Sequence, residues 1–268
     1  MKKKYRYLFI GLLSANTLIG HTAMAQDQSD IAKKLSNPVA ALISVPIQAN
    51  YDDNIGTDDG SVWKTNIQPV IPFSIGQDWN LISRTILPVI DQVDIPKNGS
   101  GESGVGDVVQ SFFFSPKQPS SNGLIWGVGP ALLLDTASDA ALGSGKWGAG
   151  PTGVALKQEG PWTYGVLANH IESFAGDSSR TDVSSTYLQP FMSYITETKT
   201  TLGVNTESTY DWKAEQWSVP FNFTLNQLIK AGDQLLQVGG GARYWAESPD
   251  NGPDGWGLRL QITFLYPK

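Results

Sequence analysis

The stretch GWGLRLQITFLY, residues 255–266, alternates between large apolar side chains and polar ones. Its apolar positions are Trp256, Leu258, Leu260, Ile262, Phe264 and Tyr266, and the positions between them include Arg259, Gln261 and Thr263. A period of two residues is typical of a β-strand with one apolar face and one polar face. The stretch is also long enough for a tilted strand to cross a lipid bilayer. It therefore predicts a strand that spans a membrane.

Eleven further segments show a similar alternation, some less cleanly, and many begin or end on Trp, Tyr or Phe. Aromatic rings at strand ends form the two interfacial girdles of membrane barrels. The segments are 41–51, 63–73, 79–90, 106–115, 123–134, 147–158, 162–173, 184–195, 200–211, 217–225 and 234–246. We therefore predict an all-β fold over residues 39–268, a transmembrane antiparallel up-and-down β-barrel of about 12 strands, with a short N-terminal helix or plug.

The segments that join the strands alternate in length. Longer polar loops are 52–61, 91–105, 135–146, 175–183 and 247–255, and shorter turns are 74–78, 159–161 and 196–199. Outer-membrane barrels have long extracellular loops and short periplasmic turns. An even number of strands then places both chain ends in the periplasm. Residues 117–122, 211–215 and 226–233 do not fit this alternation in length.

A soluble β-sandwich is the alternative fold, because its strands alternate as well. It explains neither the aromatic strand ends nor strands that are about twice the usual length of roughly 5–6 residues. Proline removes a hydrogen bond from a sheet, which disfavours either fold. We expect the prolines of the candidate strands to lie near strand ends or at bulges; they are Pro69, Pro72, Pro88, Pro130, Pro151, Pro190 and Pro220.

Residues 1–25 have the pattern of a secretory signal peptide, with Lys2, Lys3, Lys4 and Arg6 before an apolar run and Ala23-Met24-Ala25 as the cleavage site. The apolar run is shorter than the roughly 20 residues of a membrane anchor. We expect cleavage after Ala25 and insertion into the outer membrane of a Gram-negative bacterium. Residues 26–38 are polar with helical spacing, and they form either a plug helix at the periplasmic mouth or a linker.

Composition narrows the range of functions. The chain has no Cys, and His170 is the only His beyond the signal peptide, so we expect neither a metal site nor a bound cofactor. The net charge of −6 argues against a nucleic-acid partner. The expected partners are outer-membrane lipid, the outer-membrane assembly machinery through the C-terminal strand, and a small solute.

Charged residues within the strands should face the lumen, because a charge facing lipid costs about 2–4 kcal/mol at the midplane. This rule predicts a lumen lined by both signs of charge. The predicted lining residues are Lys64, Arg84, Asp107, Lys157, Glu172, Glu207, Arg243 and Arg259.

Several stretches are similar to a family of outer-membrane barrels grouped with phenol-degradation (MetA-pathway) proteins and described as transporters, of which some members carry the label neuromedin U. The similar stretches are NPVAALISVP at 37–46, QPVIP at 68–72, DWNLISR at 78–84, GKWGAGP at 145–151, ESTYDW at 207–212 and GLR at 257–259. A Pro-Thr-Ala run expected in the family is replaced by Asp135-Thr136-Ala137. The resemblance implies a barrel and, more loosely, transport, and it implies no catalytic residues.

The sequence therefore favours a porin-like transporter or channel for small solutes, among them apolar or aromatic ones, and not an enzyme. Two alternatives stay open. One is an outer-membrane hydrolase or acyl transferase, in which His170 and Glu172 would act with a serine on a neighbouring strand. The other is a closed structural barrel whose inner charges pair with one another.

Overall fold

The structure is a computed structural model that describes residues 29–97 and 99–266. The expected signal peptide lies outside the described residues. A short helix covers residues 29–35, and twelve antiparallel strands then form a closed barrel, which confirms the predicted fold. No helix in the described part of the chain is both long enough and apolar enough to cross a membrane.

Three of the twelve strands are divided into two segments each, namely β2 with β3, β5 with β6, and β11 with β12. The segments are β1 (Ile43–Ile55), β2 (Gly60–Ile67), β3 (Val70–Ile75), β4 (Trp79–Val93), β5 (Gly101–Val105), β6 (Val108–Pro116), β7 (Ile125–Leu134), β8 (Lys146–Glu159), β9 (Trp162–Gly176), β10 (Ser184–Ile195), β11 (Thr200–Thr206), β12 (Ser208–Asp211), β13 (Gln216–Ala231), β14 (Gln234–Glu247) and β15 (Gly255–Tyr266).

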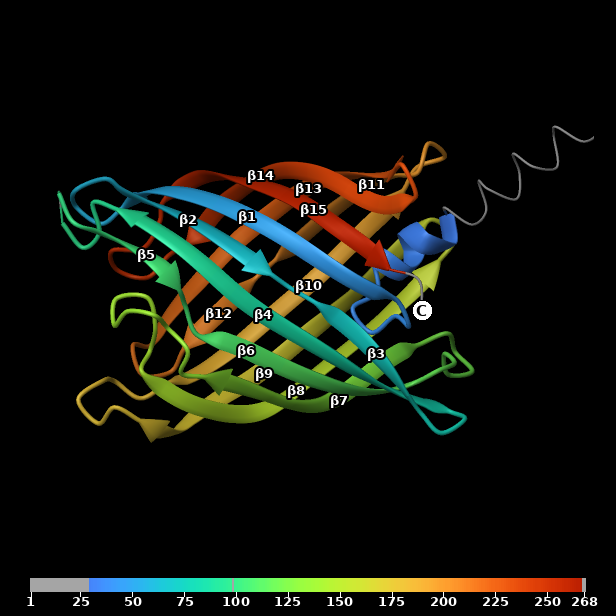
Figure 1. The fold of residues 1–268 in the computed structure, drawn as a ribbon, viewed down its shortest axis with the longest axis horizontal. Coiled ribbons are helices and arrows are strands. Elements are labelled where there is room, and N and C mark those ends of the chain that lie inside the picture. Colours follow the sequence, from blue (N-terminus) through green and yellow to red (C-terminus); the bar gives the residue numbers. More distant parts are fainter. Residues whose placement is uncertain (1–28, 98, 267–268) are drawn as a thin grey trace, which may run out of the picture.

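The first and last strands close the barrel, as Figure 1 shows. β1 pairs with β15 in antiparallel register, with Ile47 opposite Ile262 and Asn50 opposite Arg259. Neighbouring residues on a strand point to opposite faces, so the register places each apolar pair on one face and each polar pair on the other. The seam is therefore amphipathic in the same way as the rest of the wall.

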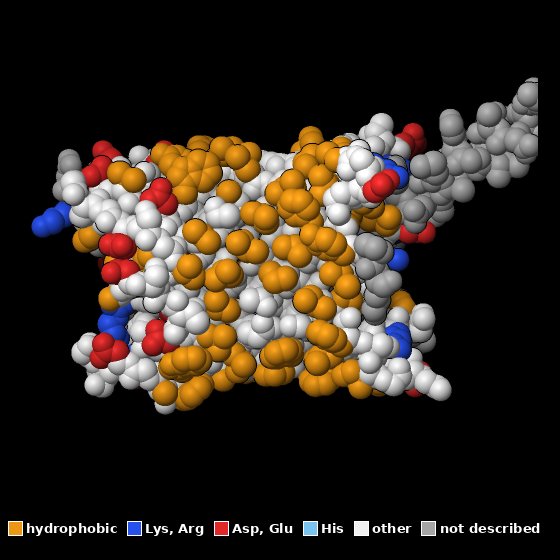
Figure 2. Space-filling model, viewed as in Figure 1, with side chains coloured by type: hydrophobic (Ala, Val, Ile, Leu, Met, Phe, Trp, Pro, Cys, Tyr) orange, Lys and Arg blue, Asp and Glu red, His pale blue; other side chains and the backbone are white. Residues whose placement is uncertain are grey.

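The outer face is apolar around the middle of the barrel. Figure 2 shows hydrophobic side chains in a broad band, with charged side chains gathered at both ends. On β15, Trp256 is 63% exposed and Leu260 is 49% exposed, whereas Arg259 between them is only 2% exposed. The strand alternation predicted from the sequence is thus a division between the outside and the inside of the barrel.

Aromatic rings at the strand ends contact one another in pairs. Tyr51 lies against Trp63 and Tyr244 against Trp256 near one end, and Trp162 lies against Tyr194 near the other. Ring centroids in these three pairs are 4.7–5.1 Å apart, within the usual range for aromatic contacts. Aromatic rings therefore mark both borders of the apolar band.

The two ends of the barrel differ. In Figure 1 the N-terminal helix and the end of β15 lie together at the right, where short turns join β3 to β4 and β8 to β9. We call this the turn end. At the opposite end, the loop end, longer segments follow β4, β7, β9 and β14.

The prolines only partly follow the expectation. Pro69 lies in the break between β2 and β3, and Pro220 lies at a bulge in β13, as expected. Pro130 and Pro151, however, lie inside β7 and β8, directly opposite each other. Neither proline has an N–H to donate. The pairing of β7 with β8 tolerates both prolines because their backbone nitrogens point away from each other, towards β6 for Pro130 and towards β9 for Pro151. The residue pairing of β6 with β7 and of β8 with β9 is interrupted at this level.

A few polar side chains on the outer face bond to one another. Thr85 donates to Oε1 of Gln110 at 2.6 Å, and Nε2 of Gln110 donates to Oγ of Ser83 at 3.0 Å. Polar groups that face lipid are costly unless they are hydrogen-bonded. The three side chains satisfy one another's hydrogen-bonding groups across β4 and β6. Ser83 and Thr85 can therefore face lipid, which lets Arg84 between them point inward.

Candidate functional site

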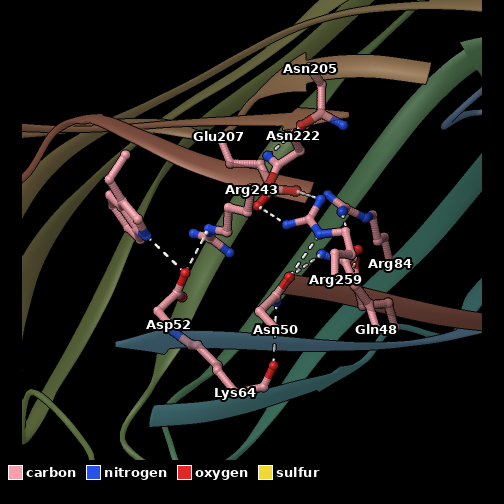
Figure 3. Close-up of polar contacts among 12 residues, drawn as sticks. Gln48, Asn50, Asp52, Lys64, Arg84, Asn205, Glu207, Asn222, Arg243 and Arg259 are labelled. Atoms are coloured by element: carbon pink, nitrogen blue, oxygen red, sulfur yellow. Dashed lines mark hydrogen bonds and ion pairs between the residues drawn. The ribbon is translucent and has the colours of Figure 1, made fainter. Parts of the chain in front are cut away.

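Ten polar residues form one wall of the barrel interior, which we call the polar wall. Figure 3 shows them converging from β1, β2 and β4 on one side and from β11 to β15 on the other. They are Gln48, Asn50, Asp52, Lys64, Arg84, Asn205, Glu207, Asn222, Arg243 and Arg259.

An ion pair between Arg259 and Glu207 lies at the centre of this wall. Nη1 and Nη2 of Arg259 donate to the two carboxylate oxygens of Glu207 at 2.9 and 2.8 Å. Nε of the same guanidinium donates to Oδ1 of Asn50 at 2.7 Å. The two-pronged geometry is the strongest form of arginine–carboxylate contact, and it joins β15 to the junction of β11 and β12.

A second charged group lies closer to the loop end. Oδ1 of Asp52 accepts a hydrogen bond from Nε1 of Trp245 at 2.8 Å and lies 3.4 Å from Nε of Arg243. The guanidinium carbon of Arg243 is 4.6 Å from the ring centroid of Trp245. Stacking and ion pairing thus hold Arg243 against the wall.

The polar wall has more cations than carboxylates. Lys64, Arg84, Arg243 and Arg259 face only two carboxylates, Asp52 and Glu207. Lys64 lies opposite the inward-facing Asn50, yet its side chain is exposed. The interior beside Lys64 is therefore open space, and its electrostatic character is positive.

The opposite wall is apolar, which the sequence reasoning missed. Ile82, Phe113, Val154, Leu156 and Leu167 point inward and are at most 3% exposed. Together with Val39, which precedes β1, they form the apolar cluster. Val154 and Leu156 alternate with outward residues of β8 and could have indicated this face, but the rule that places strand charges in the lumen predicts polar groups there.

The apolar cluster also binds the segment before β1, residues 29–42, which we call the inner segment. Val39 is 4% exposed and Ala32 is fully buried. Nε2 of Gln158, on the inner face of β8, donates to the backbone oxygen of Lys33 at 2.8 Å. Figure 1 shows the helix of this segment within the turn end of the barrel.

A cavity of about 170 Å³ lies between the inner segment and the barrel wall. Lys34, Pro38 and Leu42 form part of its lining, and Arg84, Gln189 and Gln237 contribute from the strands. The cavity therefore joins the polar wall to the turn end of the barrel.

Of the predicted lining residues, Lys64, Arg84, Glu207, Arg243 and Arg259 lie in the interior. Lys157 and Glu172 do not, because Leu156 and Ile171 occupy the inward positions next to them. Lys157 lies near the turn end of β8, and Glu172 lies near the loop end of β9. The expectation was wrong for these two because a charge near the bilayer interface costs only about 0–1 kcal/mol.

His170 also lies on the outer face. Its Nδ1 is 2.9 Å from Oγ1 of Thr186 on β10, and its Nε2 is 3.4 Å from Oε2 of Glu172. Thr186 in turn accepts a hydrogen bond from Nε1 of Trp212 at 2.9 Å. The hydroxyl across the strand pair is thus a threonine rather than the expected serine, in contact with a tryptophan of the interfacial girdle.

Asp107 lies in the break between β5 and β6, where it holds a loop instead of lining an open lumen. Its Oδ1 accepts from the backbone N–H groups of Thr136 and Ala137 at 3.3 and 3.2 Å. Its Oδ2 accepts from the N–H and the hydroxyl of Ser144 at 2.6 and 2.7 Å. One carboxylate thereby fixes both ends of the loop between β7 and β8, whose Leu142 is 6% exposed.

We expect Asp107→Ala to release this loop, because hydrogen bonds to a charged group contribute about 1.5–3 kcal/mol each. Hydrogen exchange should show at least about tenfold faster exchange of the loop amides in the variant. Asp135→Ala, which removes an exposed carboxylate from the same loop, is the control and should leave these amides unchanged. Equal exchange in the Asp107 variant and the parent would contradict the assigned role.

An ion pair between Lys146 and Asp182 lies at the loop end, next to this loop. Nζ of Lys146 donates to Oδ1 of Asp182 at 2.7 Å. The hydrogen bond and the charge of Lys146 lower the pKa of Asp182 from its ordinary value. The carboxylate therefore stays charged to a lower pH than a free aspartate does, and so does its link to the start of β8.

Comparison with known proteins supports the fold. No family model matches the chain, and no curated protein matches it. A crystal structure of an outer membrane channel from Pseudomonas putida F1 is similar, with a TM-score of 0.65 and 16% identity, over 84% of this chain and 96% of that one. The β domain of the Bordetella autotransporter BrkA aligns with a TM-score of 0.45 and 9% identity, over 84% of this chain and all of that one. At 16% identity, the similarity to the Pseudomonas channel shows a shared fold, the closed β-barrel of outer-membrane proteins.

Proposed function

We propose that the protein is an outer-membrane channel for small solutes and that the inner segment narrows its periplasmic mouth. The observation that carries this proposal is the exposed side chain of Lys64 inside the barrel. A barrel of about twelve strands is wide enough that side chains need not fill it. An exposed lysine on an inward position is what such an unfilled interior produces.

The chemistry of the two walls supports a choice of solute. A polar wall with excess positive charge faces a wall made of Ile82, Phe113 and Leu167. A path between these walls suits small solutes that have an apolar or aromatic body. Export by the signal peptide, cleavage after Ala25, and insertion by the assembly machinery through β15 complete the proposal.

Conductance in a planar lipid bilayer tests the channel. A refolded chain that begins at residue 26 is compared with one that begins at residue 39 and therefore lacks most of the inner segment. We expect a small steady conductance from the first and a several-fold larger one from the second, because the helix and the residues up to Pro38 no longer narrow the turn end. Heat-shifted gel mobility confirms that both barrels are folded. If neither folded form conducts ions, the proposed channel function is wrong. If both forms have equal conductance, the inner segment does not narrow the channel.

A further inference from the structure

The cavity between the inner segment and the barrel wall contains an arginine that forms no ion pair with a described carboxylate. Arg84 lines the cavity, and the one hydrogen bond that its side chain makes to the described residues runs from Nη2 to the neutral Oε1 of Gln68 at 2.9 Å. A guanidinium has five N–H donors, so most of its capacity is not used by protein acceptors. None of the ion pairs formed among the described residues includes Arg84.

The interior carboxylates are already engaged by other arginines. Glu207 is close enough to Arg84 to interact with its charge, but both of its oxygens accept hydrogen bonds from Arg259. Asp52 is engaged by Arg243 and Trp245. A partly buried cation that is hydrogen-bonded to no carboxylate is poorly compensated, and an anion from solution would relieve that cost.

Among the residues that the structure describes, those that line the rest of the cavity include no acidic side chain. Its polar groups are mostly the neutral amides of Gln68, Gln189, Gln237 and Gln261, and Lys34 adds a second cation. Amides can hydrogen-bond to a carboxylate but cannot neutralise a guanidinium. The described lining of the cavity therefore carries positive charge and attracts anions.

The size and the apolar part of the cavity restrict the anion further. Leu42, Val70 and Leu167 also line it, and Val70 packs against the apolar cluster. At about 170 Å³ it is smaller than the roughly 300–1,000 Å³ of sites for drug-sized ligands. A planar carboxylate matches the fork of a guanidinium with two parallel hydrogen bonds.

We propose that this cavity is a binding site for a small organic carboxylate whose charged group pairs with Arg84 and whose apolar body lies toward Val70 and Leu167. The proposal deepens the channel function and rests on it for its biological role, because it names the class of solute. The binding itself requires only the folded barrel.

Binding of benzoate to the full chain from residue 26, folded in detergent, tests the site by titration calorimetry. We expect measurable affinity for benzoate and at least about tenfold weaker affinity in Arg84→Gln, since a charge-assisted pair contributes about that much. Arg84→Lys should retain part of the affinity. Lys157→Gln removes one positive charge from the outer face and should bind as the parent does.

Two ligand controls separate charge from apolar contact and from simple salt effects. Benzyl alcohol has the same ring without the charge and should bind at least about tenfold more weakly than benzoate. Chloride at equal concentration should not displace benzoate. Equal benzoate affinity in Arg84→Gln and the parent, with both confirmed as folded by gel mobility, would overturn the proposal, as would equal affinity for benzyl alcohol.

The outcomes for binding and for conductance are distinct. Benzoate binding that depends on Arg84, in a barrel that conducts no ions, would overturn the channel and keep the binding site. A conducting barrel that does not bind benzoate would overturn the binding site and keep the channel.

Discussion

Glu207→Gln will lower the free energy of unfolding of the barrel by about 3 kcal/mol, the lower end of what breaking a buried ion pair costs. The substitution keeps the shape of the side chain but leaves the guanidinium of Arg259, which is 2% exposed, without its counter-charge. It also leaves Arg84 and Arg243 without a nearby shared carboxylate. Unfolding in guanidinium chloride, followed by tryptophan fluorescence, measures the loss.

The matched control is Glu172→Gln, which removes the carboxylate that lies beside His170 on the outer face. The side chains of His170 and Glu172 are 40% and 55% exposed, so water compensates for the lost contact. We expect a much smaller effect there than at Glu207. If both variants unfold at the same denaturant concentration as the parent, the interior pair contributes nothing to stability and the polar wall is hydrated throughout.

Phe113→Ala should have a similarly large effect, for a different reason. The ring of Phe113 is fully buried at the centre of the apolar cluster. Replacing a buried Phe with Ala costs about 3–5 kcal/mol through lost burial and the cavity that remains. Because the same cluster holds Val39, we also expect the inner segment to loosen and the conductance of the barrel to rise.

Phe114 provides a control on the next residue of the same strand. It points outward and is 45% exposed, so Phe114→Ala loses little packing inside the protein. We expect near-parental stability and conductance for this variant. Equal losses of stability in the two variants would mean that the apolar cluster has no special role in stability. Unchanged conductance in Phe113→Ala would mean that the apolar cluster does not hold the inner segment in place.

The sequence is sufficient to predict the strands because each one shows its two faces directly. Leu258, Leu260 and Ile262 cannot face water, and Arg259 and Gln261 cannot face lipid, so the alternation permits one arrangement. The same rule fails near the bilayer interface. Lys157 and Glu172 can lie outside there at little cost, so their charge does not indicate the side of the wall.

The partners inside the barrel are beyond the reach of alternation. Arg259 and Glu207 are 52 residues apart in the chain, and only closure of the sheet brings them together. The apolar cluster is hidden for a related reason, because Val39 contributes to it from outside any strand. Alternation tells which side chains point inward, but it carries no information on which of them meet across the lumen.

The seam between β1 and β15 also bears on how the protein assembles. Arg259 is on the last strand, and it bonds to Asn50 on the first strand and to Glu207 near the middle of the chain. Until that strand arrives, Glu207 lacks its partner and the edges of β1 and β14 are unpaired. The twelve residues of β15 therefore complete the sheet and supply the ion-pair partner of Glu207 in one event. A chain truncated before Arg259 would therefore form an open sheet whose inner face is exposed to water, and not a smaller closed barrel.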